Sequence, residues 1–137
     1  MRSLLFIPAD SPRKLEKGLS SGADALIVDL EDSIAPAGKD AARANAKAFL
    51  QETGSIAARP RLLVRVNGLQ TGLADADLDA VMAGAPDGIM LPKAEGGAAI
   101  IHLDAKLAAR EAMHGLPDGQ TRIVALATET EIGRAHV

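Results

Sequence analysis

Short aliphatic runs alternate with helical patterns along this chain. Between the runs, apolar residues recur every three or four positions in segments that start near residues 12, 39, 74 and 97, which is the period of a helix packed on one side. This alternation predicts parallel strands covered by helices, either as an open doubly wound sheet or as a (β/α)₈ barrel. The predicted strands are residues 4–8, 25–30, 62–66, 88–91 and 123–127.

Ionisable residues follow the predicted strands at their carboxyl ends. Because side chains alternate between the two faces of a strand, Asp29 should share a face with Ile27, and Lys93 should share a face with Leu91. Charged groups at the carboxyl ends of several parallel strands are typical of the mouth of a barrel. The pattern therefore favours a barrel, and the residues expected together at its mouth are Asp29, Glu31, Arg65, Lys93 and Glu129.

The length bounds how much of a barrel is present. A (β/α)₈ barrel needs about 250 residues and eight strands, whereas this chain has 137 residues and five predicted strands. We therefore expect residues 1–130 to form the amino-terminal half of a TIM barrel, with about five of its eight strands. Residues 131–137 read as the in-frame translation of a common sequencing adapter, so we expect this tail to be non-native; the alternative is a genuine helix start.

Composition excludes several classes of protein. The net charge of −3 and the aromatic content of 1% argue against a nucleic-acid surface. Cysteine is absent, so disulfides and thiolate metal sites are excluded, and no signal segment precedes the first strand. No apolar run approaches the roughly 20 residues that span a membrane. These features predict a cytoplasmic protein without a membrane or nucleic-acid partner.

Five segments, in order and spaced along nearly the whole chain, carry a family resemblance. They are residues 2–8 (RSLLFIP), 22–32 (GADALIVDLED), 64–67 (VRVN), 91–95 (LPKAE) and 125–130 (ALATET). In these segments the chain resembles the HpcH/HpaI aldolase and citrate lyase β-subunit family. The Asp-Leu-Glu-Asp segment and the helix start at Ser11 resemble the branch that cleaves CoA thioesters more than the keto-acid aldolase branch.

The resemblance implies a Mg²⁺-dependent TIM-barrel lyase that acts on a β-hydroxyacyl-CoA and usually assembles as a trimer or hexamer or as a subunit of a lyase complex. It implies that Arg65 is catalytic and grips substrate oxygens, and that Glu129 is catalytic, contacts substrate and ligates Mg²⁺. The second metal ligand, an aspartate on a later strand, is expected beyond residue 137. The residues that the resemblance places at the CoA site are Phe6 and Lys17, with Arg13 as the candidate substitute for a phosphate-binding arginine expected at Ser11.

The residue types fit this chemistry, but each has a plainer interpretation. Arg65 brings a planar donor fork suited to a carboxylate or enolate, and it could equally form a structural ion pair with Asp29 or Glu31. Glu129 could be a solvated strand end. Lys93 could hold a substrate oxygen or form a Schiff base, and we assign it to the electrostatics of substrate binding. The residues expected to hold Arg65 and Lys93 in position, without contacting substrate themselves, are Asp29, Glu31, Asp32 and Asn67.

Three functions therefore remain open. The first is a lyase for a citryl-, malyl- or citramalyl-type CoA thioester, which proceeds through an enolate. The second is a 2-keto acid aldolase that forms pyruvate. The third is a truncated chain with no activity and poor solubility, because its outermost strands would be unpaired edges.

Overall fold

The computed structural model describes residues 3–94, 96–126 and 135–136. The strands are β1 (Leu4–Pro8), β2 (Ala25–Asp29), β3 (Arg61–Arg65), β4 (Gly88–Leu91), β5 (Arg122–Leu126) and β6 (Ala135–His136). The helices are α1 (Pro12–Gly18), α2 (Lys39–Thr53), α3 (Ala74–Val81) and α4 (Gly97–Met113), with short 3₁₀ turns η1 (Pro36–Gly38), η2 (Leu69–Thr71) and η3 (Met82–Gly84). Every strand and helix predicted from the aliphatic pattern is present, with ends that differ by at most a few residues.

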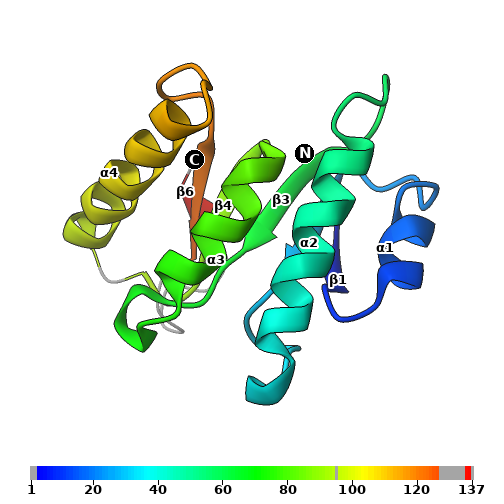
Figure 1. Cartoon of the computed structure of the whole chain (residues 1–137), viewed down its shortest axis with the longest axis horizontal. Coiled ribbons are helices and arrows are strands. Elements are labelled where there is room, and N and C mark those ends of the chain that lie inside the picture. The colour runs from blue at the N-terminus through cyan, green and yellow to red at the C-terminus, as the bar shows by residue number, and fades with distance from the viewer. Residues whose placement is uncertain (1–2, 95, 127–134, 137) are drawn as a thin grey trace.

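The order of the strands decides between the two predicted architectures. Strands β1 to β5 are parallel and lie side by side in chain order, and α1 to α4 all cover the same face of the sheet (Figure 1). A doubly wound sheet would reverse its strand order and carry helices on both faces. The prediction of a partial (β/α)₈ barrel is therefore confirmed.

Strand β6 was not predicted. It pairs antiparallel with β5, with Ala125 opposite His136 and Leu126 opposite Ala135. It lies within the segment 131–137, and the origin of that segment stays a prediction.

The start of α1 shows how local sequence fixes an element. Ser11 is extended, and its side-chain oxygen accepts a hydrogen bond from the backbone N–H of Lys14 at 3.3 Å. Pro12 occupies the first helical position, where a missing N–H costs nothing. Ser11 therefore caps the helix that follows the carboxyl end of β1.

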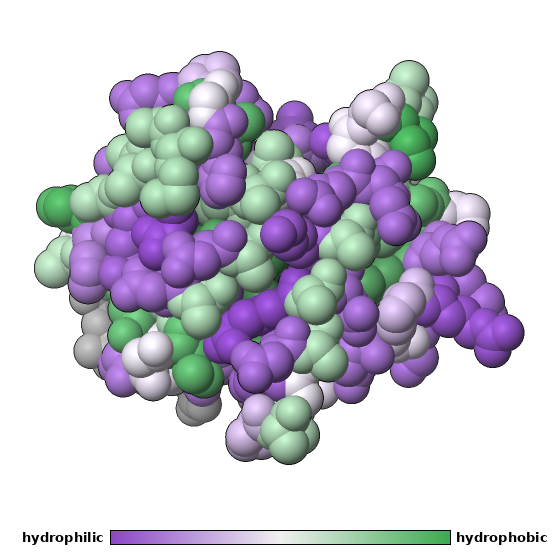
Figure 2. Space-filling view, viewed as in Figure 1, coloured by the Kyte–Doolittle hydropathy of each residue, from purple (hydrophilic) through white to green (hydrophobic). Residues whose placement is uncertain are grey.

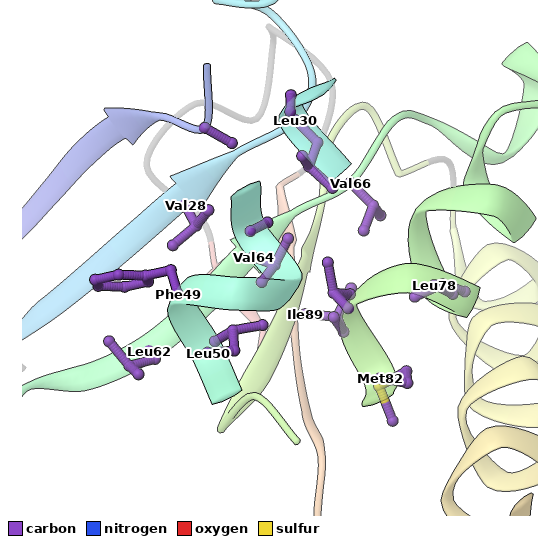
Figure 3. Close-up of a cluster of buried hydrophobic side chains, with 14 of the residues drawn as sticks. Val28, Leu30, Phe49, Leu50, Leu62, Val64, Val66, Leu78, Met82 and Ile89 are labelled. Atoms are coloured by element: carbon purple, nitrogen blue, oxygen red, sulfur yellow. The ribbon is translucent and has the colours of Figure 1, made fainter. Parts of the chain in front are cut away.

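The main core lies between the sheet and the helix layer. Alternate strand residues such as Val28, Leu62 and Ile89 meet Phe49 and Leu50 of α2 there (Figure 3). All are nearly or fully removed from solvent. Burial of this aliphatic face, at about 25 cal/mol per Å² of apolar surface, is the main force that holds the helices on the sheet.

The opposite face of the sheet carries a smaller apolar cluster made of Ile27, Leu63, Met90 and Val124. These side chains point to the side that a closed barrel would enclose. The prediction that Asp29 shares the face of Ile27 on β2 therefore fits the side that a closed barrel would enclose. For β4 the predicted face was wrong, because Leu91 belongs with Ile89 to the core that faces the helices.

The outer surface of the helix layer is a mosaic of hydrophilic and hydrophobic residues without one dominant apolar area (Figure 2). None of the helices in the described part of the chain is both long enough and apolar enough to cross a membrane.

Candidate active site

Arg65 and Asp29 form a two-fold hydrogen-bonded ion pair where β2 and β3 end. Arg65 Nε donates to Asp29 Oδ1 and Nη2 donates to Oδ2, both at 2.8 Å. The two residues are register partners on adjacent strands, and alternation aims both away from the helices. The Asp29 side chain is 2% exposed and that of Arg65 is 17% exposed. The predicted ion pair is thus present, and it fixes the plane of the guanidinium.

The loop after β2 wraps around the Asp29 carboxylate. The backbone N–H groups of Glu31 and Ser33 donate to it at 2.9 and 3.1 Å, and Ser33 Oγ donates at 2.6 Å. Burial opposes ionisation of Asp29, but the hydrogen bonds from Arg65, Ser33 and Glu31 outweigh it and hold the pKa of this carboxyl well below its ordinary value. The hydrogen bond to Asp29 in turn raises the pKa of Arg65. Both groups are therefore charged at neutral pH.

Glu31 lies between two cations. Its Oε1 is 3.6 Å from Arg65 Nε, and its Oε2 accepts a hydrogen bond from Lys93 Nζ at 3.3 Å. Lys93 follows Pro92 and has a left-handed backbone with φ of 52°. This turn breaks the strand alternation, so Lys93 reaches the mouth although Leu91 faces the helices. The lysine side chain remains 67% exposed.

A pocket of about 250 Å³ opens beside Arg65. Its wall includes Phe6 and Pro8 of β1 together with Asp29, Asp32, Ser33 and Arg65. The Arg65 guanidinium carbon stands 4.8 Å from the centre of the Phe6 ring, a cation–π contact that the sequence did not predict. Asp32 borders the pocket, and its charge adds to the field that favours the Arg65 cation.

The remaining predicted residues are placed as follows. Arg13 and Lys17 are exposed on α1. Glu129 lies outside the described residues. Asn67 was expected to orient Arg65 or Lys93 from the same face. Instead it is buried towards the helices, where its backbone N–H and side-chain amide donate to Asp77 at 2.8 and 2.7 Å. The expected position was wrong because β3 ends at Arg65, and strict alternation stops there.

A buried polar network beneath the mouth was missed entirely. Lys39 Nζ donates to the carbonyl oxygens of Leu30 and Glu31 and to Asn67 Oδ1. Asp77, which is fully buried, accepts from Asn67 and from Arg43 Nε. The only sequence signal is a pair of cations, Lys39 and Arg43, one turn apart on the helix after the mouth loop.

Two of the described carboxylates at the mouth are paired with cations. Asp29 is taken by Arg65 and the loop, and Glu31 by Arg65 and Lys93. Across residues 3–94 and 96–126, no group of three or more His, Cys, Asp or Glu side chains is arranged to hold a metal ion. This part of the chain therefore brings an oriented guanidinium and a lysine to the mouth, and it does not by itself form a metal site.

Comparison with known proteins assigns the chain that carries this site to a family. The model of the HpcH/HpaI aldolase/citrate lyase family matches residues 2–133. The chain belongs to this family. The match extends over both strands that carry the Arg65–Asp29 pair and over the mouth loops, so the resemblance first noted in five short segments holds for nearly the full length.

Two curated proteins are similar to this chain. The citrate lyase subunit β of Leuconostoc mesenteroides subsp. cremoris is 34% identical over 134 residues, covering 96% of this chain and 43% of that protein. A (3S)-malyl-CoA thioesterase of Cereibacter sphaeroides is 46% identical over 92 residues, covering 67% of this chain and 32% of that protein. The chain thus spans less than half the length of these relatives.

Solved structures agree with the fold. A citrate lyase β subunit from Mycobacterium tuberculosis, complexed with oxaloacetate and magnesium, matches with a TM-score of 0.60 at 34% identity, over 89% of this chain and 56% of that chain. Haloferax volcanii malate synthase, in a magnesium and glyoxylate complex, matches with a TM-score of 0.81 at 19% identity, over 95% of this chain and 43% of that chain. The second likeness supports the fold alone.

Proposed function

We propose that residues 1–130 form the amino-terminal half of a TIM-barrel enzyme that cleaves a carbon–carbon bond in a β-hydroxyacyl-CoA thioester of the citryl, malyl or citramalyl type. In this reaction the hydroxyl loses its proton and becomes a carbonyl. The bond between the α and β carbons breaks, and its electron pair forms the enolate of the released thioester. Negative charge thus develops on oxygen, and the site must supply fixed positive charge there.

The orientation of Arg65 is the observation that carries the proposal. Asp29 engages the guanidinium through two N–H groups out of five, so donors remain for a substrate oxygen. The Phe6 ring and the bidentate pair hold the guanidinium plane beside the pocket before substrate arrives. A cation that is already oriented stabilises developing charge without reorganising during the reaction.

We propose Mg²⁺ as the cofactor, with Glu129 as one ligand and a carboxylate from a later strand as another. A bound Mg²⁺ would act as a Lewis acid towards substrate oxygens. The M. tuberculosis relative holds magnesium together with oxaloacetate, a product expected of citrate cleavage. On this view Arg65 and Lys93 bind the acyl end of the substrate, while Phe6, Arg13 and Lys17 face the CoA portion.

Thioester hydrolysis is a second candidate function. The observation that favours it is the identity of 46% to (3S)-malyl-CoA thioesterase over 92 residues, beside 34% to the citrate lyase β subunit over 134 residues. Both reactions use a CoA thioester and a cationic site that stabilises oxygen, so the residues described above serve either. The pyruvate-forming keto-acid aldolase is a third candidate function, and product analysis can detect it as well.

Product analysis of the full-length protein separates these reactions. With Mg²⁺ and malyl-CoA, a lyase releases acetyl-CoA and glyoxylate, whereas a thioesterase releases malate and free CoA. We expect Arg65→Lys to lower kcat/KM about 10²–10³-fold, because an ammonium cannot reproduce the planar fork. Arg122→Lys is the matched control, since Arg122 is exposed at the amino end of β5.

Each result has a clear meaning. Acetyl-CoA production that EDTA abolishes supports the lyase. Free CoA without acetyl-CoA replaces the lyase with the thioesterase, and pyruvate formation from a CoA-free keto acid replaces it with the aldolase. Absence of turnover with every substrate, or full activity of Arg65→Lys, contradicts the proposed function.

A further inference from the structure

Two oppositely charged side chains hold the backbone of the segment after β2, one at each edge. On one edge, the Asp29 carboxylate accepts the N–H groups of Glu31 and Ser33 at 2.9 and 3.1 Å. On the other, the Lys39 ammonium donates to the carbonyl oxygens of Leu30 and Glu31, both at 2.8 Å. The peptide that carries Glu31 is therefore clamped between an anion and a cation.

Lys39 uses its whole donor capacity in this clamp. An ammonium group has three N–H donors, and the third bond goes to Asn67 Oδ1 at 2.9 Å. Asn67 is itself fixed, because it is buried and donates twice to Asp77. Lys39 thus joins the loop after β2 to the loop after β3, and no donor remains for a ligand.

Glu31 is the residue whose position depends on this clamp. Its carboxylate is 3.6 Å from Arg65 Nε and 3.3 Å from Lys93 Nζ, so it bridges the two cations at the mouth. We propose that Lys39 is a positioning residue that holds Glu31, and through it Arg65 and Lys93, in register for the reaction. This inference rests on the proposed function only where it concerns turnover; the clamp itself can be tested without it.

Kinetics of the full-length protein test the consequence for turnover. We expect Lys39→Met to lower kcat/KM about 10–100-fold, the usual effect of removing a group that orients a reactive one. The matched control is Lys47→Met, an exposed lysine about two turns further along α2. Adding Lys39→Met to Glu31→Gln should cost less than about threefold, because two residues that act through one another are not additive. Additive losses would overturn the route through Glu31.

Hydrogen–deuterium exchange tests the clamp without any assay of activity. We expect the peptide spanning residues 30–34 to exchange faster in Lys39→Met than in the wild type or in Lys47→Met, while peptides from β3 and β4 are unchanged. Unchanged exchange in residues 30–34 would overturn the positioning role. If the wild type shows no turnover of CoA thioesters, the proposed function fails, and the exchange result still decides the role of Lys39.

A folding check completes the design. If circular dichroism shows that Lys39→Met does not fold, Lys39→Gln replaces it, because the amide keeps two N–H donors. Faster exchange confined to residues 30–34 in Lys39→Gln supports the proposal. Loss of folding in both variants overturns it in favour of a purely structural lysine.

Discussion

At the scale of single residues, the ionised Asp29 carboxylate stabilises the folded protein through its hydrogen-bond partners. Burial works against this carboxylate, and Arg65, Ser33 and two backbone N–H groups compensate. Loss of one partner from a buried pair leaves the other charge uncompensated and commonly costs about 3–5 kcal/mol. We therefore expect Asp29→Asn to lower the free energy of unfolding of the full-length protein by about that amount at pH 7, with exposed Asp118→Asn as the control.

The effect should depend on pH with a defined sign. The folded-state pKa of Asp29 lies below the ordinary value of 3.8, so its stabilisation is complete above that value. It is lost as the pH falls from about 4 towards the folded-state pKa. Urea unfolding should therefore show that the difference in unfolding free energy between wild type and Asp29→Asn narrows between pH 5 and pH 3. The narrowing should be on the order of the amount that linkage gives for one carboxyl with a lowered pKa. A gap that stays constant over this range would contradict the assignment.

Sequence reasoning found part of the site and missed the rest for physical reasons. The contact of Asp29 with Arg65 was predictable, because each residue ends a buried strand and both side chains point to the same face of the sheet. The Phe6 contact and the Lys39 network join residues far apart in the chain, and no local pattern records such pairings. Lys93 was expected at the mouth for an incorrect reason, since its position follows from the turn after Pro92.

At the scale of elements, α4 controls the connection into β5. Glu111 is 2% exposed, and its carboxylate accepts the backbone N–H groups of Gly119 and Thr121 at 3.0 and 2.7 Å. Burial opposes its ionisation, but these bonds outweigh it and lower the pKa of Glu111. The carboxylate thus replaces the backbone partners that the loop after α4 does not supply.

Removing this carboxylate should loosen the connection. We expect Glu111→Ala to lower the free energy of unfolding by about 1–3 kcal/mol, because it leaves the buried N–H of Thr121 without its acceptor. Glu111→Gln keeps one acceptor oxygen and should lose less. The exposed Glu52→Ala on α2 is the control. Equal unfolding free energies for Glu111→Ala and the control, measured in urea, would show that the loop finds other partners.

At the scale of the whole molecule, β1 leaves one strand edge open among the described residues. Among the described strands it pairs only with β2, and Leu4, Leu5 and Phe6 are 47%, 38% and 44% exposed. An open strand edge that also carries apolar side chains is a template for association with another chain. In a closed barrel a later strand would pair with this edge, and that strand would also complete the wall around Arg65.

We expect one substitution, Leu4→Lys, to have opposite effects in the 137-residue chain alone and in the full-length protein. We expect the 137-residue chain, expressed alone, to elute as aggregates in size-exclusion chromatography, to bind the dye ANS and to lack CoA-thioester cleavage. Leu4→Lys should reduce its aggregation, because a charge on an edge strand opposes pairing. In the full-length protein the same change should lower stability, because the alternation that places Phe6 beside Arg65 aims Leu4 into the barrel. A monomeric, active 137-residue chain would refute the need for a second half, and an unaffected full-length Leu4→Lys would refute closure over β1.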